Sequence, residues 1–215
     1  MKIAKGCNSW IYASFLPAVF FLGLSQTIPE SFRPVTFFVS FLLFLLTGFF
    51  LVFFRDPERK KGRGVVACAD GKIRELIDVK DKDVGDCVKI STFMNVQNVH
   101  VNRMIFDGKI ISIKHFSGLH LPAFKKESEK NERVIIVAET KIGIVKIIQI
   151  AGTLARRIVP YIAQGDKVKK GSRIGIIRLG SRVDVYIPRK KIKSICVKIG
   201  DRVKAGEDSI AEIND

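Results

Sequence analysis

The chain opens with two long uncharged hydrophobic runs, and the remainder alternates short β-branched segments with polar turns. The first run covers residues 10–28 and the second covers residues 35–54. The hydrocarbon core of a bilayer is about 30 Å thick and needs roughly 20 apolar residues in a helix. Both runs meet that length, and the six residues between them begin and end with proline. The pattern therefore predicts a transmembrane helical hairpin over residues 1–54, ahead of a second domain over residues 55–215.

Basic residues flank this hairpin on both sides. Lys2 and Lys5 precede it, and Arg55, Arg59 and three further bases follow it by residue 63. Because membrane proteins keep short basic flanks in the cytoplasm, we expect the globular domain on the cytoplasmic side of the cell membrane. Two alternatives are a signal peptide formed by the first run and a hairpin that dips into one leaflet. The first run is long for a signal peptide, and a second full-length run follows it directly.

The globular part reads as mainly β-structure. Ten short runs rich in β-branched residues are separated by Asp-Gly and Gly-Asp turns. The runs cover residues 65–69, 73–79, 87–93, 99–105, 109–113, 134–138, 143–150, 173–177, 183–187 and 192–197. Residues 119–133 are the main candidate for a charged helix or loop. A spacing near ten residues predicts a β-sandwich or barrel-like domain with few helices.

The chain also contains an internal repeat. The motif Gly-Asp-x-Val-x-x-Gly occurs at residues 165–171 and again at residues 200–206, and residues 85–88 form a fainter third copy. The glycines supply positive φ, and the Asp side chain stabilises the turn. The motif resembles the hairpin turn of biotinyl/lipoyl-type β-modules, but we find no carrier-lysine motif. The repeat therefore indicates fold rather than function.

Charge is concentrated behind the hairpin. The chain has a net charge of +16, with 37 Lys and Arg against 21 Asp and Glu, and only four charged side chains lie before residue 55. This balance suits an anionic membrane surface. Nucleic acid is the rival partner, but the bases are mixed with acids, and no RNA-binding, zinc-finger or helix-turn-helix pattern is present. The four cysteines are scattered without a Cys-x-x-Cys pair, so neither a metal site nor a disulfide framework is indicated.

The usual catalytic motifs are missing from the sequence. The three histidines, His100, His115 and His120, lie outside any metalloprotease pattern, and we find neither a phosphate-binding loop nor a serine-hydrolase elbow in a suitable context. Taken one by one, these residues indicate only a membrane-anchored β-domain.

Several segments in a fixed order change this interpretation. They include Ala69-Asp70-Gly71-Lys72, Asn98-Val99-His100-Val101-Asn102-Arg103 and Leu179-Gly180-Ser181-Arg182, together with residues 53–57, 91–94, 115–118, 131–133, 149–152, 155–159 and 183–185. This set resembles the phosphatidylserine decarboxylase family in its short prokaryotic branch. The resemblance covers about residues 50–210, with the hydrophobic anchor in the expected place.

The resemblance implies a pyruvoyl enzyme that matures by cutting its own Gly180–Ser181 bond. Ser181 Oγ would attack the Gly180 carbonyl, and elimination and loss of ammonia would leave a pyruvoyl group on a 181–215 chain paired with a 1–180 chain. The pyruvoyl carbonyl would form a Schiff base with the substrate amine and accept the electrons left by CO2. The implied reaction turns a serine phospholipid into the ethanolamine lipid, with no metal.

Other site residues follow from matching positions. Asp70 and His100 match the family's Asp and first His, which assist self-cleavage in a triad-like arrangement with the Ser. Arg103 stands where longer members have a second His, which leaves open whether His100 serves maturation, decarboxylation or both. Longer members also carry Thr at the position of Arg182.

For the lipid phosphate, the arginine candidates are Arg103, Arg156 and Arg157, although a solvated basic face would account for each equally well. His115 is either a site residue or structural. Asp184 alternates with two valines, so we expect its side chain to point outward.

Two other functions compete with the decarboxylase. A non-enzymatic membrane adaptor with a biotinyl/lipoyl-like domain predicts one intact chain, and a membrane-anchored Ser/His hydrolase predicts a reactive Ser181 without scission. The sequence leaves open the role of His115 beside His100, the choice between diacyl and archaeal ether lipid, and the formation of a homo-oligomer.

Overall fold

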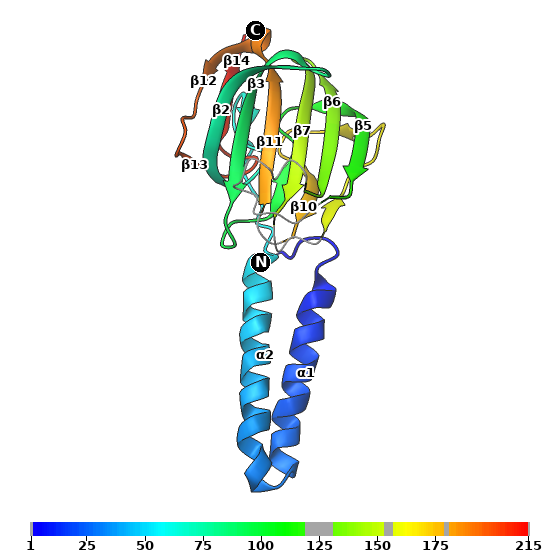
Figure 1. Cartoon of the computed structure of the whole chain (residues 1–215), viewed down its shortest axis with the longest axis vertical. Helices are drawn as coiled ribbons and strands as arrows, with labels where there is room; N and C mark the ends of the chain where they lie inside the picture. The colour runs from blue at the N-terminus through cyan, green and yellow to red at the C-terminus, as the bar shows by residue number, and fades with distance from the viewer. Residues whose placement is uncertain (1, 119–130, 153–156, 179–180, 215) are drawn as a thin grey trace. The chain divides into compact units, whose positions relative to one another are not determined.

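The computed structural model describes residues 2–118, 131–152, 157–178 and 181–214. The chain forms two compact units that meet between Pro57 and Glu58. Figure 1 gives the order of the elements along the chain.

The first unit is a pair of long helices. Helix α1 covers Asn8–Thr27, a single 3-10 turn covers Glu30–Phe32, and α2 covers Arg33–Phe53. Both helices are long and apolar enough to cross a membrane, and only 17% and 11% of their most apolar windows are buried. This low burial separates them from the core helices of a soluble protein. The structure thus bears out the predicted pair of helices.

Small polar side chains join the two helices. Ser40 Oγ donates to the Ala18 carbonyl at 2.7 Å, and Thr47 Oγ1 donates to Ser14 Oγ at 2.8 Å. Such contacts are typical of helices that pack in lipid, where a polar group needs a partner inside the protein.

The two ends of the hairpin also meet. The Ala4 amide donates to the Phe54 carbonyl, and the Asp56 amide donates to the Lys2 carbonyl, both at 2.8 Å. The two flanks therefore leave the hairpin at the same end.

The second unit is built on an antiparallel sheet of eight strands in the order β13-β2-β3-β11-β7-β6-β5-β9. Its strands are β13 (Arg202–Val203), β2 (Gly71–Asp81), β3 (Gly85–Met94), β11 (Ser181–Pro188), β7 (Gly143–Ala151), β6 (Arg133–Thr140), β5 (Gly108–Phe116) and β9 (Lys167–Val168). Strand β11 pairs with β3 on one side and with β7 on the other. The strand that begins at Ser181 is therefore central.

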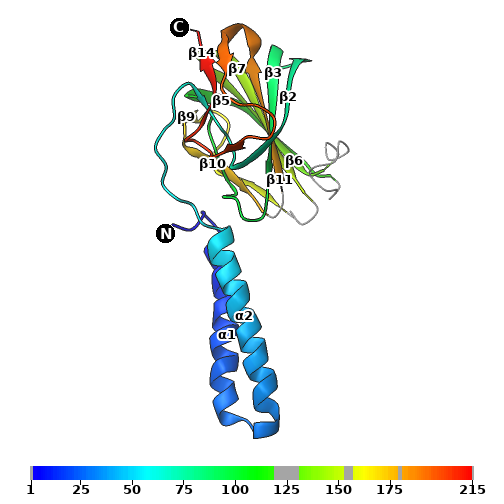
Figure 2. The ribbon, with the colours of Figure 1, turned by 90° about the vertical axis from the view of Figure 1, so that its left-hand side faces the viewer.

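Two three-stranded sheets complete the unit, in the orders β1-β14-β12 and β4-β10-β8. They consist of β1 (Val65–Val66), β14 (Ser209–Ile213), β12 (Ile192–Ile195), β4 (Val101–Arg103), β10 (Arg173–Ile177) and β8 (Ile158–Pro160), and a 3-10 turn covers Arg189–Lys191. Figure 2 shows β10 and β14 on one side of the large sheet. Each of the ten predicted runs contains a strand, which confirms the mainly β class with a sandwich-like core.

One hydrophobic core lies between the large sheet and the small ones. It takes Ile73, Ile90 and Val183 from the large sheet, and Ile174 and Ile210 from the small ones. Along β11 the odd-numbered residues enter this core, because successive side chains of a strand point to opposite faces. Ser181 therefore starts the strand on its core-facing side.

The repeat seen in the sequence forms two equivalent corners. The tetrapeptide Asp-Gly-Lys-Ile occurs at residues 70–73 and again at residues 107–110, and each copy pairs with one Gly-Asp-x-Val-x-x-Gly segment. Asp70 Oδ1 accepts the Ala205 amide at 2.8 Å, and Asp107 Oδ1 accepts the Lys170 amide at 2.6 Å. The corners thus share strand pairing and an Asp-to-amide bond. The faint third copy at residues 85–88 instead belongs to the β2–β3 hairpin.

Candidate active site

Ser181 lies at the first rung of the central strand. Its backbone pairs with Met94 at the end of β3 and with Ala151 at the end of β7. The residue is fully buried, and its Oγ donates a hydrogen bond to the Met94 sulfur at 3.1 Å. A thioether is a weak acceptor, so this contact orients the hydroxyl without binding it strongly. A chain break just before Ser181 would leave the inner rungs of β11 intact.

Met94 connects Ser181 to two further polar side chains that the sequence interpretation did not single out. Asn102 Nδ2 donates to the same sulfur at 3.7 Å, and Asn102 Oδ1 accepts from Gln149 Nε2 at 2.7 Å. Asn102 and Gln149 are fully buried. All three residues lie within the segments that carry the family resemblance, which is the signal that could have identified them.

His100 immediately precedes β4, two residues before Asn102. Its ring is fully buried, and its Nδ1 lies 2.8 Å from the Asn98 carbonyl oxygen. A carbonyl only accepts, so Nδ1 carries the proton and Nε2 is the basic nitrogen of the neutral ring. The His100 carbonyl also accepts the amide of Ile177, the last residue of β10 and four positions before Ser181. The fold thus brings His100 to the strand that leads into the predicted cleavage bond.

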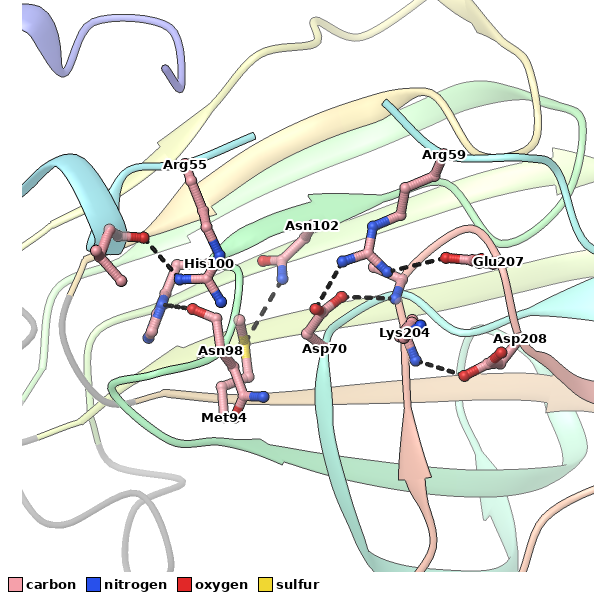
Figure 3. A network of polar contacts seen from close by, with 12 residues as sticks. Arg55, Arg59, Asp70, Met94, Asn98, His100, Asn102, Lys204, Glu207 and Asp208 are labelled. Carbon is pink, nitrogen blue, oxygen red and sulfur yellow. Dashed lines mark hydrogen bonds and ion pairs between the residues drawn. The ribbon is translucent and has the colours of Figure 1, made fainter. Parts of the chain in front are cut away.

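Asp70 immediately precedes β2, and both its oxygens are occupied. Oδ1 accepts the Ala205 amide at 2.8 Å, and Oδ2 lies 2.7 Å from Arg59 Nη2. The Arg59 and Asp70 side chains are 7% and 10% exposed, and Arg59 also lies 3.5 Å from Glu207. Figure 3 shows Met94 and Asn102 between His100 and Asp70. The Asp70 carboxylate contacts Arg59 and Ala205 and does not contact His100 directly. Asp70 and His100 therefore lie in the same region but are not hydrogen-bonded to each other.

The predicted phosphate contacts occupy different settings. Arg103 is buried, and its Nη1 donates to the Gly171 carbonyl at 3.0 Å. Arg157 is exposed beside β8. Arg156 and Gly180 lie outside the described residues, as does His120. Of these three candidates, Arg157 is therefore the one that the structure describes as accessible from solvent.

Two other residues of the sequence analysis lie on opposite faces of the large sheet, with Asp184 on its outer face and His115 on its inner face, opposite the core residue Val134. His115 Nε2 is 2.9 Å from Glu132 Oε1, and the His115 side chain is 49% exposed. Asp184 does alternate with its valine neighbours, but its side chain is only 2% exposed, because Arg182 and Lys89 cover it. The Asp184 side chain therefore points away from the core, as expected, but it is not exposed to water.

Comparison with known proteins identifies the family of this chain. The profile of the phosphatidylserine decarboxylase family matches residues 46–211. The chain belongs to this family. A protein of Methanosarcina barkeri provisionally named archaetidylserine decarboxylase proenzyme is 43% identical over 214 residues, which cover 98% of each chain. The phosphatidylserine decarboxylase proenzyme of Streptomyces avermitilis is 40% identical over 213 residues, covering 96% of this chain and 91% of the relative.

As a member of the phosphatidylserine decarboxylase family, the chain is a carboxy-lyase. Membership confirms the predicted family and argues against the adaptor, which has no chemistry to perform. Both relatives are named as proenzymes, and their shared length with this chain extends through the hydrophobic N-terminus.

Proposed function

We propose that this protein decarboxylates a serine phospholipid to the ethanolamine lipid, using a pyruvoyl group made from its own Ser181. The observation that carries the proposal is the setting of Ser181. It is a fully buried hydroxyl at the start of a central strand, and Met94 and Asn102 connect it to the strand that follows His100.

Maturation would begin when Ser181 Oγ attacks the Gly180 carbonyl carbon while His100 Nε2 accepts the hydroxyl proton. The Gly180–Ser181 C–N bond then breaks, the nitrogen takes up a proton, and an ester joins Gly180 to the serine oxygen. Loss of the Ser181 α-proton expels the Gly180 carboxylate and leaves a dehydroalanine. Water adds to its imine tautomer and releases ammonia. The 181–215 chain then carries a pyruvoyl group at its N-terminus, and the 1–180 chain carries a carboxylate at its C-terminus.

Asp70 would support this step through position and charge. Its carboxylate holds Ala205 of the future small chain and Arg59 of the future large chain, which lie on either side of the cut in sequence. We propose that this clamp keeps the two segments in register while the bond at residue 180 is strained and broken. The tautomer fixed by Asn98 gives His100 its basic Nε2.

The residues around Ser181 suit the finished group. The pyruvoyl carbonyls supply an electron sink for the electrons that the departing CO2 leaves behind. Gln149 and Asn102 are buried amides that can orient polar groups near the new chain end. Arg157 is exposed and positively charged, and we propose that it contacts the lipid phosphate.

The membrane unit would bring the lipid to this domain. Lys2, Lys5 and Arg55 gather at the end of the hairpin where its flanks meet, since the Ala4 and Asp56 amides bind across it. This arrangement supports a cytoplasmic position for the catalytic domain at an anionic bilayer surface.

The mass of the purified protein under denaturing conditions tests the proposal. The wild type should yield chains 1–180 and 181–215, with the smaller one lighter than its sequence by the elements of ammonia. Ser181→Ala should remain one inactive chain. Ser194→Ala is the matched control, because it removes an exposed serine hydroxyl from the same small chain and should mature normally.

Other results would overturn the proposal in distinguishable ways. A single wild-type chain with decarboxylase activity would exclude pyruvoyl formation. A single chain whose Ser181 reacts with serine-directed probes would favour the hydrolase. Cleavage without decarboxylation of any serine phospholipid, diacyl or ether-linked, would leave the maturation chemistry but remove the substrate.

A further inference from the structure

A buried ionic network lies behind Ser181, on the outer face of the large sheet. Arg182 forms an ion pair with Asp184, in which Nη2 donates a hydrogen bond to Oδ2 at 3.0 Å and Nε lies 3.0 Å from Oδ1. Lys89 lies 3.8 Å from Asp184 and 2.8 Å from Glu75. Ser91 adds a hydrogen bond of 3.1 Å to Glu75. We call these five residues the outer-face network.

The network is balanced in charge and largely shielded from water. It contains two cations and two carboxylates. The Asp184, Lys89 and Arg182 side chains are 2%, 10% and 11% exposed, whereas Glu75 is 38% exposed and forms the edge of the network. In such surroundings each charge depends on its partner, because an unpaired buried charge is costly. The four charged side chains therefore act as one unit rather than as separate surface pairs.

The network joins three adjacent strands. Glu75 comes from β2, Lys89 and Ser91 from β3, and Arg182 and Asp184 from β11. Asp184 stands opposite Ser91 in the ladder between β11 and β3. Arg182 and Asp184 therefore pair along β11, and Lys89 links Asp184 to Glu75 across the sheet, behind the residue proposed to carry the chemistry.

Cleavage before Ser181 would divide the network between two chains. Arg182 and Asp184 would become the second and fourth residues of the 181–215 chain, while the other three members would stay on the 1–180 chain. In the proenzyme the strand is continued by covalent bonds at both ends. After scission its first residue is a chain end, and unrestrained chain ends fray.

We propose that Arg182 and Asp184 are positioning residues that hold the new chain end at the active site, so that turnover needs them and maturation does not. This inference rests on the proposed self-cleavage. It assigns a role to Arg182, the position at which the sequence departs from longer family members, and to Asp184, whose burial the sequence did not predict.

The double variant Arg182→Met with Asp184→Asn tests the proposal. It removes one positive and one negative charge together, so that Lys89 and Glu75 remain paired at 2.8 Å. Asp81→Asn is the matched control. Asp81 is also an outer-face carboxylate paired with a buried lysine, Lys146, but both belong to the 1–180 chain, and Lys146 keeps a second carboxylate partner.

Three measurements separate positioning from folding. The cleaved fraction of the double variant, read by mass, should stay within about twofold of the wild type, because the uncut strand is held by its own continuity. The value of kcat/KM per cleaved enzyme should fall about tenfold to hundredfold, as expected when a reacting group is displaced by about 1 Å. Hydrogen exchange of residues 181–188 should speed up in the mature double variant.

The same exchange should stay slow when the two substitutions are placed in the uncleavable Ser181→Ala protein. Asp81→Asn should leave cleavage, turnover and exchange of this strand unchanged. Arg182→Lys, which keeps the charge but loses the guanidinium geometry that pairs with Asp184, provides a milder variant should the double variant not accumulate.

Two results would overturn the inference. Equal acceleration of exchange in cut and uncut proteins would make the network a general stabiliser of the sheet. Unchanged kcat/KM in a fully cleaved double variant would show that the chain end needs no such support. A wild-type protein that does not cleave would instead refute the proposed function, so the two failures are distinguishable.

Discussion

The two equivalent corners of the repeat allow one aspartate to serve as the control for the other. Asp70→Asn and Asp107→Asn both keep an amide oxygen that can accept the facing backbone N–H. They differ in the cation that each carboxylate meets. Arg59 and Asp70 are 7% and 10% exposed, whereas Lys169 and Asp107 are 75% and 52% exposed at 3.5 Å.

These exposures set the expected magnitudes. Removing one partner of a buried pair costs about 3–5 kcal/mol, whereas an exposed pair contributes about 0–1 kcal/mol. For a protein of this size, 1 kcal/mol corresponds to about 2–4 °C in Tm. Because Arg59 keeps Glu207 at 3.5 Å, Asp70→Asn should lie at the lower end of this range and lower Tm by about 6–12 °C, whereas Asp107→Asn should lower it by at most about 4 °C.

Thermal unfolding of the full chain in detergent, in the Ser181→Ala background, provides the assay, because an uncut chain unfolds as one molecule. Equal shifts for the two variants would refute the reasoning, since the shared Asp-to-amide bond would then carry the stability. The same Asp70→Asn substitution in a cleavable chain tests the proposed clamp. Kept well below its Tm, it should remain largely uncut, and wild-type cleavage would contradict a role of Asp70 in maturation.

Three further predictions follow from single positions. Cys196 is exposed while the other cysteines are buried, so a maleimide dye applied to the native mature enzyme should label the small chain, and a label found mainly on the large chain would contradict the structure. Gly71→Ala should abolish folding or maturation, because its new Cβ would lie 2.1 Å from a carbonyl oxygen of β3. Gly85→Asn should be tolerated, because Gly85 lies in an open turn with φ of 81°, a conformation that Asn can adopt. The hydrogen bond from the Lys170 amide lowers the pKa of Asp107 in the folded protein. The stabilisation from this carboxylate should therefore be present above its unfolded pKa of about 3.9 and be lost as pH falls through the lower folded value. Tm measured from pH 6 to pH 2 should fall more steeply for the wild type than for Asp107→Asn.

Much of the fold could be predicted from hydrophobic pattern alone. The two helices fall within a few residues of the two uncharged runs, since length and the absence of charge suffice to define them. The strands of the large sheet follow from β-branched runs between glycine turns. Strands β8, β9, β13 and β14 lie outside the predicted runs. The two-residue strands β9 and β13 have no periodicity of their own and exist only through pairing with β5 and β2.

Sequence motifs could predict which residues belong to the site. They could not predict the hydrogen-bond partners that determine what each of these residues does. The motifs predict Ser181, His100 and Asp70 as site residues, but the neighbours of these residues depend on long-range register. Met94 meets Ser181 across 87 residues, and Asn102 meets Gln149 across 47. The second copy of Asp-Gly-Lys-Ile was readable in the sequence, yet its meaning needed the paired corners.

The position of β11 in the middle of the large sheet has a consequence for the life of the enzyme. In the proenzyme this strand is covalently attached to the chain that precedes it, which helps it to pair between β3 and β7. A separate 35-residue peptide would instead have to insert between two strands that can pair with each other in its absence. Folding of the mature form from unfolded chains would depend on concentration and compete with collapse of the larger chain. We therefore expect denaturation of the proenzyme to be reversible and that of the mature enzyme to be permanent. Under the proposed self-cleavage, each molecule would be able to fold only once, before its chain is cut.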